Sequence, residues 1–298
     1  MAEAFVPSHA IRRFAEVLMP EACEAPILSR PVRTAIHQWR VELGAGTELE
    51  AVGLKPRRKA MLYGPPGCGK TTLAHHLSAR LGLPLVLVNA AAMISKYVGE
   101  TGANVNELFD QIIQQQDRCV LFLDEFDSLC AKRMSEQSGA ARNRNETVVA
   151  LLQKIDQFAG TLLAATNRSD DIDPAIWRRF GMHLDILEPD DECRMAIITR
   201  YLAPFTLDQR ALEVLCMATA GASPALLRQL MEGVKRDMVI APKLKLPMDC
   251  KSVFSRLIVS VRPHADMQQP PLWAVADARS RVEAMPWPPV LPDAGGEG

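Results

Sequence analysis

The stretch GPPGCGKT, from Gly64 to Thr71, holds glycines, a lysine and a threonine at the spacing of a phosphate-binding loop. Because glycine adopts left-handed conformations, backbone N–H groups here can turn inward around phosphate oxygens, at a helix N-terminus that favours negative charge. We expect Lys70 to reach the β- and γ-phosphates of a nucleotide and the Thr71 hydroxyl to bind Mg²⁺. The competing interpretation is a glycine-rich turn that binds nothing. The residues expected to bind ATP in this stretch are Pro66, Gly67, Cys68, Gly69, Lys70, Thr71 and Thr72.

The stretch VLFLDEFD places two acidic residues, Asp124 and Glu125, directly after an apolar strand. The carboxyl ends of parallel strands form the rim where open α/β sheets bind ligands. We expect Asp124 to contact the bound nucleotide and its Mg²⁺, and Glu125 to accept a proton from the water that attacks the γ-phosphate. A further strand ends at Asn167 in LLAATN, and its amide is expected to orient that water or to sense the γ-phosphate. Each motif alone also fits a helix cap or a turn; their combination favours catalysis.

Two adjacent arginines, Arg178 and Arg179, follow Asn167 after a short predicted helix in DIDPAIWRRF. Paired arginines on a surface are usually solvated charge. At this distance beyond a γ-phosphate sensor we interpret them as arginine fingers, which reach the nucleotide of a neighbouring subunit and stabilise the charge of the transition state. A finger supplied by a neighbour requires a head-to-tail interface, and such interfaces close into rings.

Short apolar runs alternate with helical periods from residue 60 onward, which predicts a parallel sheet flanked by helices. The strands are expected in AMLY, LPLVLVN, CVLFLDEFD, GTLLAATN and MHLDIL. Ile11, Phe14 and Leu18 are predicted to share one face of a helix in the segment that precedes them. We therefore expect a helical lead-in and linker at 1–56, an α/β subdomain at 57–189, an all-helical subdomain at 190–265 and an extended, proline-rich tail at 266–298.

The charge balance is nearly neutral, with 34 Lys and Arg residues against 35 Asp and Glu residues in 298. No bulk electric field therefore steers the chain toward nucleic acid or an anionic membrane. The seven cysteines have no C-x-x-C spacing, which is typical of reduced thiols in a cytoplasm. The sequence shows neither a secretory leader nor an apolar run long enough to cross a membrane. We expect a cytoplasmic protein without a membrane partner.

Together, the motifs GPPGCGKT, VLFLDEFD, AATN and DPAIWRRF resemble those of the AAA+ ATPases, and within them the AAA branch in its narrow sense, over about residues 55–265. The resemblance implies a P-loop nucleotide-hydrolase sheet followed by a helical lid, ATP and Mg²⁺ as ligands, and a homo-hexamer. It also implies that Gly221 and Ala222, in TAGASPALLRQL, lie near the adenine and ribose. Many other AAA+ branches carry a sensor arginine in the lid helix where this chain reads Ser-Pro-Ala, which favours the narrow branch.

The same resemblance assigns a role to the triplet Lys96, Tyr97 and Val98. In this family the loop after the second strand faces the central pore of the ring, and its aromatic residue grips an extended polypeptide between neighbouring subunits. A flat ring can pack against many side chains and loses little conformational entropy when it does so. The competing interpretation is that Tyr97 packs over the helix that follows.

The function implied is an ATP-hydrolysing ring that pulls a protein segment through its pore and remodels or unfolds a dedicated client. The short lead-in leaves recruitment of that client to the tails, the pore or an adaptor protein. The clients considered are a HORMA-domain protein of bacterial anti-phage signalling and the substrate of a paired protease. One alternative is a nucleic-acid motor or clamp loader, against which the near-neutral charge and the aromatic triplet argue. Another is an ATP-gated scaffold that switches assembly without translocating anything.

Overall fold

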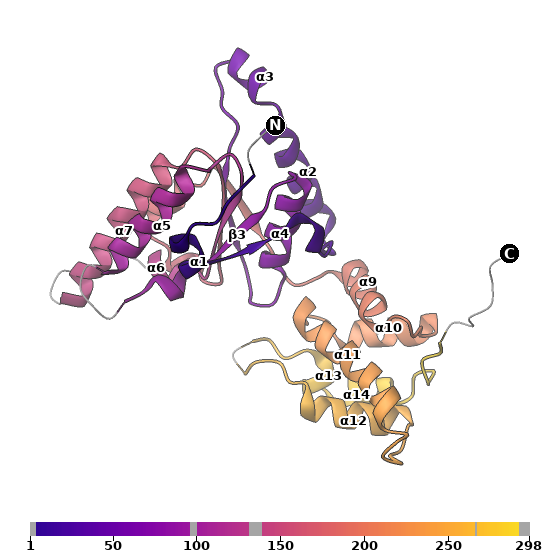
Figure 1. The fold of residues 1–298 in the computed structure, drawn as a ribbon. Coiled ribbons are helices and arrows are strands. Elements are labelled where there is room, and N and C mark those ends of the chain that lie inside the picture. Colours follow the sequence, from indigo (N-terminus) through magenta and orange to yellow (C-terminus); the bar gives the residue numbers. More distant parts are fainter. Residues whose placement is uncertain (1–3, 96–99, 131–138, 266, 292–298) are drawn as a thin grey trace. The chain divides into compact units, whose positions relative to one another are not determined.

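The computed structural model describes residues 4–95, 100–130, 139–265 and 267–291 of the chain. The chain groups into two compact units (Figure 1). The α/β unit consists of Met1–Pro26, Arg30–Gly64 and Gly69–Ile186, and the helical unit consists of Ile27–Ser29, Pro65–Cys68 and Leu187–Gly298. Within the described residues, none of the helices combines the length and the apolar character needed to cross a membrane.

A six-stranded sheet forms the centre of the α/β unit, in the order β1-β3-β4-β5-β2-β6. Apart from β1, all its neighbouring strands pair in parallel, which confirms the α/β fold expected from the alternating pattern. Their apolar runs are nearly continuous because both faces of a parallel sheet are covered. The parallel strands are β2 (Lys59–Tyr63), β3 (Leu85–Asn89), β4 (Val120–Asp124), β5 (Thr161–Thr166) and β6 (Met182–Asp185).

The lead-in supplies the remaining strand, which the sequence analysis missed. Helix α1 (His9–Phe14) ends early, and β1 (Ala15–Leu18) pairs antiparallel to β3 with Leu18 opposite Leu85. The predicted helical face through Leu18 is therefore wrong, although Ile11 and the end of α1 are buried in the core as expected. The physical reason is that β1 gives hydrogen-bond partners to backbone groups of β3 that would otherwise lie at an open sheet edge.

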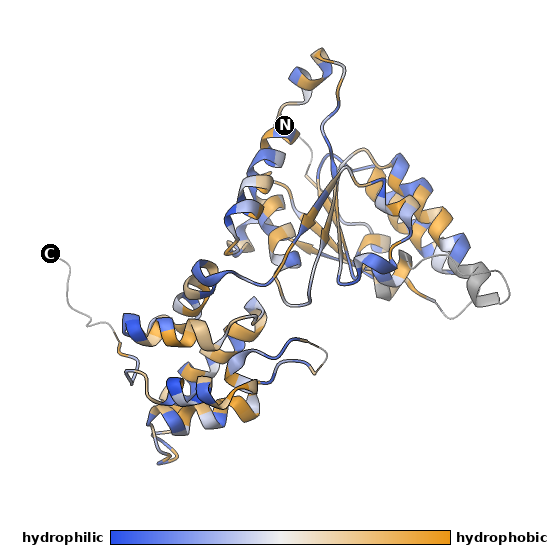
Figure 2. Cartoon of the chain, turned by 180° about the vertical axis from the view of Figure 1, so that it is seen from behind, coloured by the Kyte–Doolittle hydropathy of each residue, from blue (hydrophilic) through white to orange (hydrophobic). Residues whose placement is uncertain are grey.

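Helices cover both faces of the sheet (Figure 1). Helices α2 (Arg30–Gly44) and α4 (Lys70–Arg80) lie on one face, and α5 (Glu100–Ile113) and α7 (Gly139–Gln157) lie side by side on the other. For α4, α5 and α7, which connect parallel strands, right-handed crossovers produce this arrangement, because the chain crosses the sheet in opposite directions before and after β3. In Figure 2, the apolar sides of these helices, coloured orange, face the strands. The shorter elements are η1 (Pro20–Ala22), α3 (Gly46–Ala51), η2 (Ala90–Met93), α6 (Asp127–Cys130), η3 (Ser169–Asp171) and α8 (Pro174–Trp177).

The helical unit follows β6, as the end of the strand pattern predicts. Its longer helices begin at side chains that accept a hydrogen bond from the first turn: Asp190, Asp208, Ser223 and Asp249. Such N-caps each contribute about 1 kcal/mol and satisfy N–H groups that the helix leaves unpaired. The helices are α9 (Asp191–Leu202), α10 (Gln209–Ala218), α11 (Pro224–Ile240), α12 (Cys250–Ser260), α13 (Pro271–Ala274) and α14 (Ala276–Glu283).

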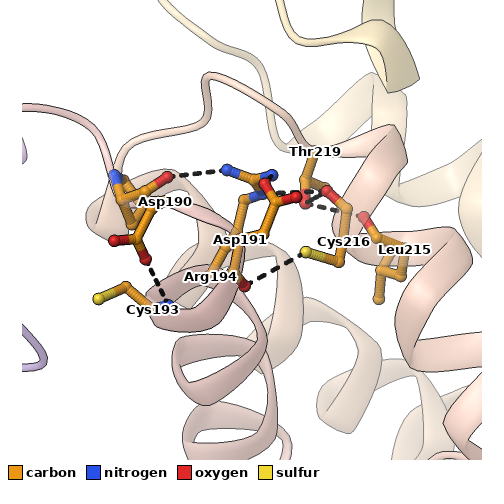
Figure 3. A network of polar contacts seen from close by, with 8 residues as sticks. Asp190, Asp191, Cys193, Arg194, Leu215, Cys216 and Thr219 are labelled. Carbon is orange, nitrogen blue, oxygen red and sulfur yellow. Dashed lines mark hydrogen bonds and ion pairs between the residues drawn. The ribbon is translucent and has the colours of Figure 1, made fainter. Parts of the chain in front are cut away.

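A buried arginine, Arg194, joins the start of α9 to the end of α10 (Figure 3). Its side chain donates from Nε to the Cys216 carbonyl oxygen at 3.0 Å and from Nη1 to the Pro189 carbonyl oxygen at 2.8 Å, and its Nη2 pairs with Asp191. A guanidinium with only 5% of its residue surface exposed needs such partners, because a buried charge without them is costly. Arg194 therefore fixes Pro189 to the helical unit.

The proline-rich segment at residues 270–291 is folded, contrary to the expectation of an extended tail. Helices α13 and α14 bring Leu272 and Val282, both fully buried, into the core of the helical unit. Trp287 donates from Nε1 to the Met248 carbonyl oxygen at 2.8 Å and meets Phe254 edge to face, with ring centroids 5.7 Å apart. Leu272 and Val282 are far apart in the sequence, but their complete burial holds the segment against the rest of the helical unit.

Candidate active site

The loop from Gly64 to Gly69 joins β2 to α4, which confirms the predicted strand–loop–helix context. Gly64 has a φ of +139°, and a Cβ at this position would lie 2.3 Å from the Ile186 carbonyl oxygen. Gly67 and Gly69 also have positive φ, of +75° and +89°. These conformations require glycine for steric reasons, and they turn the backbone sharply ahead of the N-terminus of α4. The loop therefore has the curvature that a phosphate cradle needs.

The side chain of Lys70 is buried, with 7% of the residue surface exposed. Its Nζ donates to the Gly64 carbonyl oxygen at 2.8 Å and to Asn167 Oδ1 at 2.7 Å. Asn167 follows directly after β5, and β5 is the neighbour of β2 in the sheet. The fold thus brings the predicted phosphate-binding lysine and the predicted water-orienting amide together, although 97 positions separate them in the sequence.

Thr71 and Asp124 form the second contact between motifs. Thr71 Oγ1 donates to Asp124 Oδ2 at 2.9 Å, and the other carboxylate oxygen, Oδ1, accepts from the Glu125 backbone N–H at 3.0 Å. The hydroxyl and the carboxylate are oxygen donors of the kind that Mg²⁺ prefers. Both residues expected to hold the metal therefore lie within one hydrogen bond of each other, and this donor set fits the ion. Thr72 follows in the first turn of α4 and is half-buried.

Glu125 has a left-handed backbone conformation, with a φ of +51°, and its side chain is exposed. A residue other than glycine in this region carries strain of about 1–3 kcal/mol and persists only where the surroundings enforce it. Two contacts enforce it here. The Glu125 N–H is held by Asp124, and the next N–H, that of Phe126, donates to the Ala165 carbonyl oxygen of β5 at 2.9 Å. This backbone conformation turns Glu125 away from the direction of β4, at the rim that carries Asp124 and Asn167.

Sequence analysis missed a supporting pair, Asp127 and Thr166. Thr166 Oγ1 donates to Asp127 Oδ1 at 2.9 Å and accepts from the Arg168 N–H at 2.9 Å. The pair therefore ties the segment after β4 to the segment that carries Asn167. The signal in the sequence is a threonine at the end of a run that is otherwise apolar, together with a second aspartate in DEFD.

The tandem arginines lie beyond the amino ends of the strands, whereas the phosphate loop follows their carboxyl ends. They precede β6, whose first residue Met182 pairs with Ala60 at the amino end of β2, whereas Gly64 follows the carboxyl end of β2. Arg178 is exposed, and Arg179 is half-buried beside Asp156 at the end of α7. The structure therefore does not bring these arginines to the phosphate loop of their own chain.

The other predicted residues lie in three further stretches of the sequence. Lys96, Tyr97 and Val98 lie outside the described residues, between η2 and α5. Gly221 and Ala222 belong to the helical unit, where Gly221 has a φ of +77° and Ala222 is fully buried in the core. Pro66 and Gly67 are exposed, and the Cys68 side chain is buried. The roles of these residues toward a nucleotide or a client stay predictions.

The sheet order, the glycine loop between β2 and α4, and the acidic rim at the end of β4 define a P-loop nucleotide hydrolase fold followed by a helical unit. Residues 60–187 match the family described as "ATPase family associated with various cellular activities (AAA)". This part of the chain belongs to the AAA ATPases, which confirms the resemblance drawn from the motifs.

Curated relatives extend the similarity. Proteasome-activating nucleotidases are 36% identical over 187 residues in Pyrococcus abyssi, covering 61% of this chain and 47% of the relative, and 34% identical over 228 residues in Thermococcus onnurineus, covering 72% and 57%. An uncharacterized AAA family ATPase of Sinorhizobium fredii is 42% identical over 163 residues, covering 54% and 47%. The chain thus spans about half the length of these relatives.

Proposed function

We propose that this chain hydrolyses ATP and uses the cycle to remodel or unfold a protein. The observation that carries the first half is the hydrogen bond from Lys70 Nζ to Asn167 Oδ1, at 2.7 Å, beside the bond between Thr71 and Asp124 at 2.9 Å. Four side chains from three separate segments converge at one rim of the sheet, and each has the chemistry that phosphoryl transfer from a nucleotide to water requires.

Each residue then has one task. The backbone N–H groups of the glycine loop and Lys70 hold the phosphates, and Thr71 and Asp124 hold Mg²⁺, which neutralises charge on the phosphate oxygens when bound. Asn167 orients the attacking water. Glu125 is the general base, and its exposed carboxylate accepts the proton of that water.

The proposal includes assembly of identical copies into a hexameric ring. Phosphoryl transfer is also assisted by a guanidinium, and the tandem arginines of the same chain lie beyond the amino ends of the strands, away from the phosphate loop. Copies stacked head to tail would place the arginines of one copy at the rim of the next, and such heterologous contacts close into rings.

A polypeptide is the proposed substrate of the ring, gripped by Lys96, Tyr97 and Val98 in a central pore. The name of the relatives, proteasome-activating nucleotidase, favours the substrate of a paired protease over a HORMA-domain protein as the client. The composition supports a protein client rather than nucleic acid, since positive and negative charges nearly cancel. A cytoplasmic location completes the proposal.

The test uses purified full-length protein with ATP and Mg²⁺. We expect ATP hydrolysis that depends on protein concentration, a hexamer by mass photometry, and a Glu125→Gln variant that binds ATP, hydrolyses it at least a hundredfold more slowly and retains a client on affinity capture. Full-speed hydrolysis by a monomer would overturn the ring.

The Tyr97→Ala variant should hydrolyse ATP but fail to unfold the captured client. Retention of unfolding by this variant would indicate a scaffold. Stimulation of ATP hydrolysis by single-stranded DNA, lost at high salt, would indicate a nucleic-acid motor.

A further inference from the structure

The two adjacent arginines differ sharply in what they contact. Arg179 donates from Nε to both carboxylate oxygens of Asp156, at 2.9 and 3.0 Å, and from Nη1 to the Ala175 carbonyl oxygen at 2.6 Å. Arg178 is exposed, and its guanidinium forms no hydrogen bond or ion pair with any of the described residues. One arginine is therefore held by its own chain, and the other is available to a partner.

Asp156 holds Arg179 at the C-terminal end of α7, a place that suits cations. The helix macrodipole puts partial negative charge there, and the carboxylate adds a full one. The neighbouring carbonyl oxygen, that of Ile155, accepts a hydrogen bond from Lys59 Nζ. The end of α7 thus anchors two cations from two other segments, the start of β2 and the segment after α8.

Cations outnumber anions around this ion pair. A cavity of about 510 Å³ is lined by Arg57, Arg58 and Lys59 and also by Glu50 and Asp156, and Arg57 is itself paired with Glu42. Burial, the largest cause, lowers the pKa of the Lys59 ammonium, while Asp156 raises it and Arg179 lowers it. Without the charge of Asp156, the Arg179 guanidinium would lose its counter-ion, and the remaining excess of cations would favour its release toward solvent.

Aromatic contacts on both sides fix the backbone of the arginine pair. Trp177 stacks on His183 with ring centroids 4.1 Å apart, and its carbonyl oxygen contacts His183 Nε2 at 3.1 Å. Phe180 is buried and packs edge to face on Phe126. These contacts hold the backbone on both sides of Arg178 and Arg179. The difference between the two arginines therefore lies in the contacts that each side chain makes.

We propose that Asp156 is a positioning residue that keeps Arg179 on its own chain, so that Arg178 alone acts on the nucleotide bound by a second copy. The inference rests on the proposed function, because it presupposes an arginine supplied by a neighbour. Arg179 then serves to tie the segment after α8 to the end of α7. Since half-exposed ion pairs contribute only about 0.2–1 kcal/mol to stability, Asp156 can be changed without loss of the fold.

The experiment compares the rate constant kcat of ATP hydrolysis among full-length variants whose hexamers and thermal unfolding are checked first. Arg178→Ala should lower kcat by about 10³-fold or more, the range of an arginine finger. Adding Asp156→Asn to Arg178→Ala should raise kcat again by about two- to fivefold, because Arg179 is released from its half-exposed ion pair to take the vacant place. The triple variant with Arg179→Ala should lose that gain, and Asp156→Glu, which keeps the carboxylate, should produce none. A purely structural role for Asp156 cannot produce a gain.

The outcomes separate this inference from the proposed function. If Arg178→Ala lowers kcat but Asp156→Asn brings no recovery, the assignment to Asp156 is overturned while action by a neighbour stands. A loss of kcat in Arg179→Lys as large as that in Arg178→Ala, with unchanged KM for ATP, would also overturn it. If Arg178→Ala hydrolyses ATP at the unaltered rate and mixing with Lys70→Ala subunits changes nothing, the ring mechanism itself fails.

Discussion

Phe126 and Phe180 meet edge to face, with ring centroids 5.9 Å apart and ring planes at 73°. Phe126 follows the candidate base Glu125, and Phe180 follows Arg179, so one aromatic pair joins the segment of the base to the segment of the tandem arginines. Both rings are buried, and such pairs contribute about 0.5–1.5 kcal/mol beyond the area that they bury. The position of the segment that carries Glu125 is thus coupled to that of the segment that carries the tandem arginines.

The variant Phe180→Leu tests whether this pair matters for activity. We expect the free energy of unfolding to fall by about 1–2 kcal/mol and kcat of ATP hydrolysis to fall at least tenfold, because both flanking segments lose a fixed position. Denaturant unfolding and steady-state ATPase assays measure the two effects. Phe109→Leu is the matched control, since it removes a similar edge-to-face contact, with Phe158 at 6.4 Å, away from the site. Equal losses of kcat in the two variants would contradict the expectation.

Gly64→Ala should destabilise the protein by about 3 kcal/mol or more and abolish ATP binding. The new Cβ would lie 2.3 Å from a backbone oxygen of Ile186, in a conformation that L side chains rarely adopt. Gly82→Ala is the control: its φ is +69°, yet nothing lies within 4 Å of the added carbon, so we expect a cost of about 1 kcal/mol and normal binding. Thermal unfolding and nucleotide titration distinguish the two; similar losses would show that the close approach at Gly64 is unimportant.

Thr71→Val and Thr71→Ser form a matched pair for the metal. Valine keeps the shape of threonine but removes the oxygen that donates to Asp124. We expect Thr71→Val to raise the Mg²⁺ concentration for half-maximal ATPase activity at least tenfold, whereas Thr71→Ser retains the hydroxyl and stays within about threefold of the parent. Titration of Mg²⁺ at fixed ATP measures this. An unchanged Mg²⁺ requirement in the valine variant would remove Thr71 from the metal site.

Leu272→Ala tests the packing of the C-terminal segment. Leu272 is fully buried in the core of the helical unit, so its truncation should lower the free energy of unfolding by about 2–5 kcal/mol. Leu291 is 59% exposed, and Leu291→Ala should change stability by less than about 0.5 kcal/mol. Denaturant unfolding of both variants is sufficient. If the two substitutions cost the same, the segment after residue 270 is not part of the core.

Cys119 predicts a loss of stability at high pH. Burial raises the pKa of its thiol from 9.0 to about 12, with a smaller contribution from the charge of Asp117. The folded thiol therefore keeps its proton at a pH where the unfolded thiol has lost it. Its stabilising effect is complete below pH 9 and decreases by about 1.4 kcal/mol per pH unit above that, until the pH reaches the folded pKa.

The measurement is the free energy of unfolding at pH 8 and at pH 10 for the parent and for Cys119→Ala. The parent should lose about 1 kcal/mol more than the variant over this interval, even though the substitution also costs stability at both values. Parallel losses would mean that the Cys119 thiol ionises as readily in the folded protein as in the unfolded chain.

The sequence by itself determined the α/β sheet and the assignment of residues 60–187 to the AAA family, because each depends on local patterns. A glycine loop between a strand and a helix, and an apolar run that ends in two acids, are short-range signals that neighbouring residues dictate. Helix starts such as Asp190 and Ser223 are equally local, since a cap acts within one turn.

Only the tertiary structure decided the rest, because those features depend on partners distant in the sequence. Residues 15–18 form a strand because β3 offers an open edge, not because of their own pattern. The segment at residues 270–291 folds because the helical core accepts Leu272 and Val282. The two arginines look equivalent in the sequence, and the carboxylate of Asp156, brought there by α7, is what makes them different.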